Sequence, residues 1–107
     1  MILIVVKFET KPEWTERFPD LVADFTAATR NEAGNLWFDW SRSLENPAEY
    51  VLVEGFRDGD AGREHVESEH FKKFIQDTPA ALAGTPLIIS QTVDATGWSP
   101  MGEMQVS

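Results

Sequence analysis

The chain has 107 residues, 42% of them hydrophobic and 25% charged, and a formal net charge of −9 at pH 7. This composition is typical of one globular domain with a single core. The acidic surplus would repel phosphate backbones and anionic lipid, so neither nucleic acid nor membrane is an expected partner. The sequence contains no cysteine, which excludes disulfides and thiolate chemistry and favours a cytoplasmic location. The apolar run that ends at Lys7 is too short for a membrane span or a signal peptide.

A strand over 2–9 and a helix that follows it directly are the first predicted elements. The strand is indicated by the β-branched and aromatic residues of ILIVVKFE. Pro12 suits the first turn of a helix, and apolar residues then recur at helical spacing as far as the region 31–34. Pro19 lies inside this pattern, and because it lacks a backbone donor it predicts a kink or a break.

A hairpin, a second helix and a last strand complete the predicted elements. The hairpin strands cover 35–43 and 49–57, because the intervening LENPAE contains the turn dipeptide Asn-Pro. An amphipathic helix is predicted over 61–77, with an interruption near Ser68. The apolar LIISQTVD then predicts a strand over 87–94.

The predicted order β-α-β-β-α-β is that of a ferredoxin-like α+β fold, in which two helices cover one face of a four-stranded antiparallel sheet. Both faces of the first strand are nevertheless apolar. One face carries Ile2, Ile4, Val6 and Phe8, and the other carries Leu3 and Val5. A second copy of the chain would cover the open face, which predicts a homodimer. We expect residues 1–94 to form the domain and the apolar tail 95–107 to pack on its own subunit or on the partner.

The stretch from Gly34 to Phe71 resembles the antibiotic biosynthesis monooxygenase (ABM) family. The helix-ending Gly34-Asn35, the hairpin NPAEYVLVEGF and the helix motif HVESEHF carry the resemblance, and with the element order they cover the chain up to Asp94. The resemblance implies a dimeric α+β barrel in which two four-stranded sheets meet and the helices lie outside. It also implies a pocket between sheet and helices, where a phenol, hydroquinone or polyketide-like aromatic is oxidised by dioxygen without metal, flavin or haem.

Haem-degrading members of that family differ from this chain at three places. They carry an axial histidine at the position of Ile75, an asparagine in the first strand at Val5 or Val6, and a tryptophan at the position of His65. These differences disfavour haem, and no cofactor of any kind is expected.

Two histidines are the candidate bases. His65 lies on the apolar side of the predicted second helix, and an unperturbed imidazole titrates near pH 6.5. The alternative is a core histidine satisfied by a backbone carbonyl or by Glu54. His70 lies five residues on, about 140° round a regular helix, so in such a helix the two cannot share one tight site. Helix termination or a dimer contact is the alternative for His70.

Three residues of the strand over 35–43 are candidates for substrate contact. Asn35 opens the strand, where its amide could donate to a developing oxyanion, although an asparagine after glycine also serves turns. In a regular strand Trp37 shares a face with Asn35, whereas Trp40 lies on the other face. The two tryptophans therefore cannot line one pocket unless a bulge intervenes, and at least one belongs to the core or to an interface.

Tyr50 and Phe71 complete the predicted substrate-binding residues. Tyr50 shares a strand face with Glu54, whose carboxylate lies among apolar neighbours. Glu54 is either paired with Arg42 across the hairpin or raised in pKa and functional, and the ion pair is the preferred interpretation. No cluster of histidines and carboxylates has a spacing that indicates a metal site.

The sequence therefore predicts a cofactor-independent monooxygenase that oxidises a small electron-rich aromatic. His65 would take the phenolic proton, Asn35 would stabilise the anion and Trp37 would hold the ring. One alternative is an enzyme that isomerises or hydrates a small carbonyl metabolite with the same base. The other is a non-catalytic module that binds a small ligand, in which His65 is structural.

Overall fold

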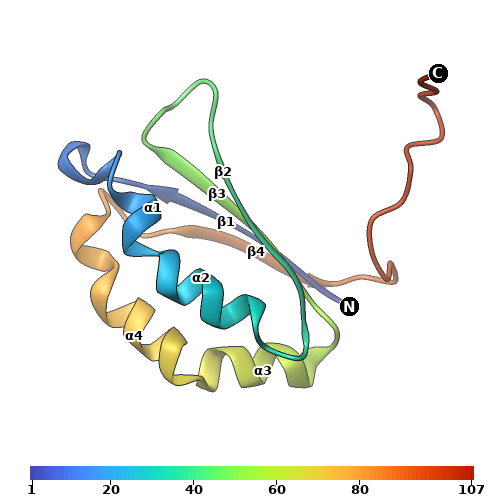
Figure 1. Ribbon diagram of the computed structural model, residues 1–107, viewed down its shortest axis with the longest axis horizontal. Coiled ribbons are helices and arrows are strands. Elements are labelled where there is room, and N and C mark those ends of the chain that lie inside the picture. Colours follow the sequence, from blue (N-terminus) through green and yellow to red (C-terminus); the bar gives the residue numbers. More distant parts are fainter.

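The computed structural model describes residues 1–107 and shows four strands in one antiparallel sheet with the helices packed on one face (Figure 1). The strands are β1 (Ile2–Glu9), β2 (Asn35–Arg42), β3 (Glu49–Phe56) and β4 (Leu87–Thr92). The helices are α1 (Phe18–Leu21), α2 (Ala23–Arg30), α3 (Gly59–Glu67) and α4 (Glu69–Asp77), with short 3-10 turns η1 (Pro12–Trp14) and η2 (Pro79–Ala81). The strand order is β2-β3-β1-β4, which confirms the predicted ferredoxin-like α+β fold.

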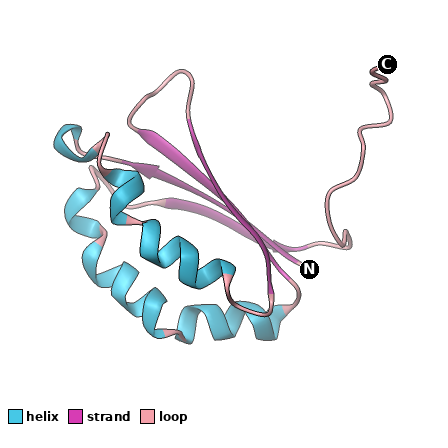
Figure 2. Ribbon diagram, viewed as in Figure 1, coloured by secondary structure: helices cyan, strands magenta, loops and turns pink.

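The register of β1 explains which side chains face the helices. Val6 lies between Leu52 of β3 and Ile88 of β4, and its alternate neighbour Phe8 is also buried. Because side chains alternate across a strand, Leu3 and Val5 point to the other face, as predicted. No helix covers that face (Figure 2).

The first helical region is divided into three pieces. The chain forms η1, then α1, and after Val22 it continues as α2. Pro19 lies in the first turn of α1, and the helical region is interrupted directly before it, between Trp14 and Phe18, as predicted. Proline is tolerated there because its missing N–H would lack an intrahelical partner in any case.

The second helical region divides at Ser68, as predicted. The backbone of Ser68 is extended, with φ −71° and ψ 155°, so it ends α3 and caps the start of α4. Its Oγ donates to the carbonyl of His65 at 2.6 Å and accepts from the Phe71 N–H at 3.1 Å. The change of direction at this cap determines where His70 lies.

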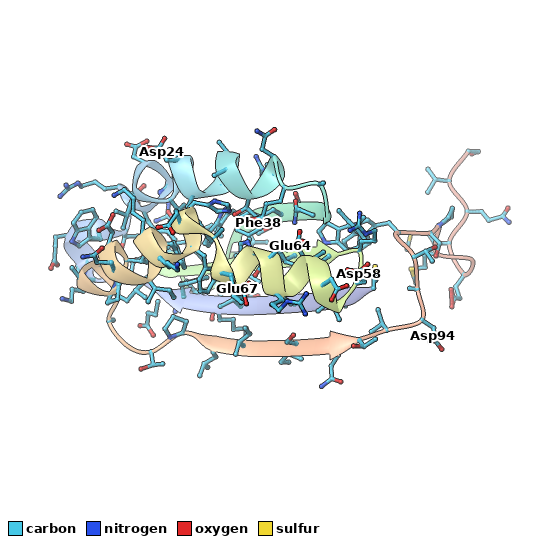
Figure 3. All side chains as sticks on the ribbon, turned by 90° about the horizontal axis from the view of Figure 1, so that it is seen from below. Asp24, Phe38, Asp58, Glu64, Glu67 and Asp94 are labelled. Carbon is cyan, nitrogen blue, oxygen red and sulfur yellow. The ribbon has the colours of Figure 1, made fainter.

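The main core lies between the sheet and the helices. Phe18, Phe38 and Phe56 have no exposed surface, and burial of an aromatic side chain contributes roughly 1.5 to 3 kcal/mol. The edge strand β4 lies beyond the helices in Figure 3, and its Leu87 and Ile89 are 70% and 66% exposed. The core therefore depends on three strands, while β4 lies open at the edge.

The tail after β4 runs away from the body of the molecule (Figure 1). Its closest aromatic contact with the domain joins Trp98 to Trp37, with ring centroids 5.4 Å apart. Packing of the tail on a partner stays a prediction. None of the helices is long and apolar enough to cross a bilayer.

Candidate active site

His65 lies in the last turn of α3 and faces the sheet. Only 4% of its surface is exposed. Phenylalanine rings surround the imidazole, with centroid distances of 4.9 Å to Phe56, 5.1 Å to Phe71 and 5.7 Å to Phe25. The predicted base is therefore held in an apolar environment, where its charged form is disfavoured.

Glu32 joins the two histidines. Its Oε2 lies 2.8 Å from His65 Nδ1 and 2.5 Å from His70 Nε2, so both imidazoles can donate to the same carboxylate oxygen. The two histidines were expected to lie apart in a regular helix, but the cap at Ser68 interrupts the helix between them and they share one site. The chain thus contains a His-Glu-His cluster, with His65 buried and Glu32 and His70 partly exposed, that unites α3, α4 and the turn before β2.

A close approach of backbone positions Glu32. The turn 31–34 crosses α3 at Gly34, where an added Cβ would lie 2.3 Å from the Cβ of Ala61. Only glycine allows this contact. The Oε1 of Glu32 is buried and has no hydrogen-bond partner, so the negative charge of Glu32 is incompletely compensated.

The hydrogen bond to Glu32 determines how His65 can react. With Nδ1–H donated to the carboxylate, a neutral His65 carries its lone pair on Nε2. This Nε2 lies 3.8 Å from Glu54 Oε1, which is beyond hydrogen-bond range. The ring is therefore oriented by one carboxylate and faces a second across a gap.

The two groups on either side of this gap have shifted pKa values. Burial raises the pKa of Glu54 from 4.5 to about 7, and the negative charge of Glu32 adds to the effect. Burial also lowers the pKa of His65 below its usual 6.5, against the opposing hydrogen bond and charge of Glu32. Near neutral pH the site therefore favours an uncharged imidazole beside a carboxyl group that retains much of its proton.

The preferred ion pair between Arg42 and Glu54 is wrong. Arg42 donates to Glu16 at 2.7 and 3.2 Å and to the carbonyl of Pro47 at 2.6 Å. In the sheet Arg42 lies opposite Tyr50. Tyr50 is four residues before Glu54 on β3, which is roughly 13 Å along the strand. Glu54 therefore has no cationic partner, and its functional interpretation remains.

Glu54 and His65 both line a cavity of about 200 Å³ between the sheet and α3 and α4. The other lining residues are Val6, Phe8, Phe25, Leu52, Phe71, Phe74, Ile75, Pro86 and Ile88. Glu54 and His65 are thus the only ionisable groups in the wall. A cavity of about 150 Å³ is enough to bind benzene, so this one can hold one substituted ring.

A wider depression adjoins this cavity. Its volume is about 450 Å³, and it shares Phe8, Phe74, Ile75 and Pro86 with the inner cavity. The side chains shared by the depression and the cavity are mostly apolar, so this region is suited to an apolar ligand.

The predicted aromatic contacts are divided between different places. Phe71 lines the cavity with His65. Trp40 and Tyr50 instead line a groove of about 330 Å³ beside α1 and α2. Trp40 Nε1 donates to Thr26 Oγ1 at 2.9 Å, and the Tyr50 hydroxyl donates to the Thr15 carbonyl at 2.7 Å. Neither of these two residues lies at the wall that contains His65.

Trp37 lies on the open face of the sheet. Its ring covers Gly55, where an added Cβ would be 2.7 Å from the indole. A bulge between Asn35 and Trp37 places Asn35 opposite Phe56, whereas Trp37 is opposite Gly55. The predicted common face of Asn35 and Trp37 is therefore wrong, because the bulge reverses the alternation. The opposite orientation of Trp37 and Trp40 is confirmed.

The side-chain amide of Asn35 stabilises this bulge. Its Nδ2 donates to the carbonyl of Trp37 at 2.9 Å and to that of Gly55 at 3.3 Å. Both N–H groups of the amide are thus occupied by main-chain oxygens. The arrangement matches the turn-type alternative for Asn35.

Glu32, His65 and His70 are also the group that could hold a metal ion. Their three ligand atoms all lie within 4.8 Å of one another. Two imidazole nitrogens and a carboxylate oxygen suit Zn²⁺ or Fe²⁺. The present distances to Oε2 are those of hydrogen bonds, so a cation would have to displace both protons. Residue spacing did not indicate this cluster, because Glu32 is 33 residues from His65.

Known proteins resemble this chain both in sequence and in fold. Residues 1–77 match the sequence model of the family described as antibiotic biosynthesis monooxygenase (ABM). The chain is 27% identical over 92 residues to YcnE of Bacillus subtilis (strain 168), whose name as a monooxygenase is provisional; the match covers 86% of this chain and 96% of YcnE.

Solved structures give close superpositions. A conserved protein from Methanosarcina mazei Go1 has a TM-score of 0.80 at 27% identity and covers 84% of this chain and 89% of its own. Rv0793 from Mycobacterium tuberculosis has a TM-score of 0.81 at 22% identity and covers 90% and 98%. At 22% identity, the similarity to Rv0793 shows a shared fold and nothing more.

Proposed function

Since the chain belongs to the antibiotic biosynthesis monooxygenase family, we propose that it oxidises a small electron-rich aromatic with dioxygen and without a cofactor. The substrate would be a hydroquinone, a phenol or a polyketide-like ring. The observation that carries this proposal is the buried His65, oriented by Glu32 and facing an apolar cavity through Nε2.

The chemistry needs a base because dioxygen has a triplet ground state and a closed-shell phenol reacts slowly with it. In the proposed mechanism His65 Nε2 takes the phenolic proton, and Glu32 stabilises the imidazolium through Nδ1–H. The phenolate then gives one electron to dioxygen, and the two radicals combine at a ring carbon that bears hydrogen. The resulting peroxide anion takes the proton back from His65 and then loses water to become a carbonyl, so phenol and dioxygen give a quinone and water and His65 is neutral again.

The phenylalanine-rich wall supports this mechanism in a second way. Phe25 and Phe74 stack with centroids 4.0 Å apart, and Phe71 packs against the imidazole. Such a wall excludes water, which strengthens the electrostatic interactions of the anion within the cavity. Trp37, on the far face of the sheet, has no part in the mechanism.

We also propose that a second copy of the chain covers the open face of the sheet. Val5 lies between Val53 and Ile89 on this face, and Trp37 Nε1 is buried there without an acceptor. An isologous partner would bury the apolar row and could supply a carbonyl to the indole. Trp37 and the tail would then belong to the interface.

Oxygen consumption tests the proposed activity. Protein treated with chelator and freed of flavin should consume dioxygen with at least one member of a panel of hydroquinones and anthrone-like phenols, and restored metal should not raise the rate. Uptake that depends on metal would overturn cofactor independence. Conversion of a carbonyl substrate without oxygen uptake would instead favour the isomerase or hydratase, and binding without turnover the ligand-binding module.

A further inference from the structure

Glu54 is the buried ionisable group that the proposed mechanism does not yet use. It lies on β3, 5% exposed, and it lines the same cavity as His65. No lysine or arginine lines this cavity, and the nearest ionisable partner is His65. A carboxyl group is rarely buried in this way without a partner, so its place in the cavity needs an explanation.

The substrate oxygen needs a hydrogen-bond donor when it becomes an anion. Asn35 cannot supply one, since both of its amide hydrogens are occupied by main-chain carbonyls. Once His65 is protonated its Nε2–H supplies one donor, and the anionic oxygen has lone pairs free to accept a second hydrogen bond. Among the side chains that line the cavity, Glu54 is the remaining polar group.

We propose that Glu54 is a second catalytic residue, whose protonated carboxyl donates a hydrogen bond to the oxygen that His65 deprotonates. This inference rests on the proposed function and deepens it, because it also defines the substrate class. The cavity takes uncharged phenols that ionise only after binding. It rejects carboxylates and phosphates, since their permanent charge would be buried near the Glu32 carboxylate with no cation in the wall.

The geometry suits one oxygen atom between the two groups. His65 Nε2 and Glu54 Oε1 are 3.8 Å apart, so an oxygen about 2.8 Å from each fits at the third corner of a triangle. The O–H of the phenol would point to Nε2, and the carboxyl O–H would point to the same oxygen. A protonated carboxyl in this role costs little reorganisation because it is already in place.

The environment keeps the proton on Glu54. Burial and the negative charge of Glu32 raise its pKa to about 7. The ionisable groups that face it are His65 on α3 and, behind His65, Glu32 and His70. The competent site has a protonated Glu54, so kcat/KM should fall as pH rises through about 7.

Two substitutions, Glu54→Gln and Glu54→Ala, distinguish whether Glu54 acts as a hydrogen-bond donor or as a base. Glu54→Gln is neutral at every pH and still has N–H donors, so we expect activity near that of the wild type at pH 6 and no decline above pH 7. Glu54→Ala loses the donor and should lower kcat by a factor of about 10² to 10³. Glu49→Gln, an equivalent change on the same strand, serves as the control. A folded Glu54→Gln as inactive as Glu54→Ala would overturn the proposal.

Binding of 4-nitrophenol tests the same claim without turnover. At pH 6 the wild type and Glu54→Gln should bind it with similar affinity, Glu54→Ala should bind it at least about tenfold more weakly, and 4-nitrobenzoate should not bind to the wild type. Equal binding of 4-nitrophenol to all three proteins, or tight binding of 4-nitrobenzoate, would contradict the role of Glu54. If binding follows the prediction while no phenol supports oxygen uptake, the oxygenase proposal fails and the donor role stands.

Discussion

Replacement of His65 by alanine is expected to lower kcat by a factor of about 10² to 10⁴, the usual contribution of a positioned general base. The physical reason is that Glu54 is protonated in the competent state and no other base lines the cavity. Oxygen uptake with a hydroquinone measures the change. The variant should remain folded, because Glu32 keeps its hydrogen bond from His70.

Two further variants make that result specific. His65→Gln retains a donor for Glu32 and much of the side-chain volume, yet it provides no basic nitrogen, so it should be as inactive as His65→Ala. Glu64→Ala alters an exposed neighbour on the same helix and should leave turnover unchanged. Activity within a factor of about two of the wild type in His65→Ala would remove His65 from the mechanism, given the size of effect expected for a general base.

Replacement of Val5 by lysine is expected to dissociate the proposed dimer. Val5 lies in the middle of the open face, with Val53 and Ile89 as its cross-strand neighbours. A charge buried without a partner costs several kcal/mol, and a two-fold interface would contain two of them. We expect the dissociation constant to rise at least about 10³-fold, as measured by sedimentation velocity over a range of concentrations.

The control for this variant is Leu44→Lys, in the loop between β2 and β3, where the side chain is 98% exposed. It adds the same charge and should leave association unchanged. A wild type that sediments as a monomer at high concentration, or a Val5→Lys protein that still dimerises tightly, would show that this face is not the interface.

The strands and their faces could be predicted from sequence because they depend on local patterns. The alternation of Ile4, Val6 and Phe8 is a property of one strand, and β1 begins and ends at the predicted residues. The last strand is shorter than predicted, since β4 ends at Thr92. The break before Pro19 could be predicted from the missing backbone donor of proline. The second division, at Val22, has no such signal in the sequence.

The candidate site was predicted only in part, because its remaining members depend on tertiary contacts. His65 and Phe71 share one helical motif and were found from it. Glu32 reaches them only through the contact of Gly34 with α3, which no local pattern encodes. His70 was set aside by assuming a regular helix, although the interruption at Ser68 had itself been predicted; applying that interruption would have joined the two histidines.

Glu54 shows how strand register changes an electrostatic assignment. The sequence suggested Arg42 as its partner across the hairpin, but the pairing of Arg42 with Tyr50 separates the two charges along the sheet. The same register places Glu54 opposite Phe38 and beneath His65. A carboxylate expected to be paired is thus a carboxyl whose pKa is raised to about 7.

Isotopic labelling of the product is the most direct test of the proposed insertion of oxygen into the aromatic ring. The metal-stripped protein should be incubated with an anthrone-like phenol under ¹⁸O₂, and the quinone analysed by mass spectrometry before it exchanges oxygen with water. Insertion by the proposed route predicts one labelled oxygen in each quinone and the other in water, with labelled quinone formed by His65→Ala about 10² to 10⁴ times more slowly. An unlabelled quinone accompanied by hydrogen peroxide would contradict oxygen insertion at this site.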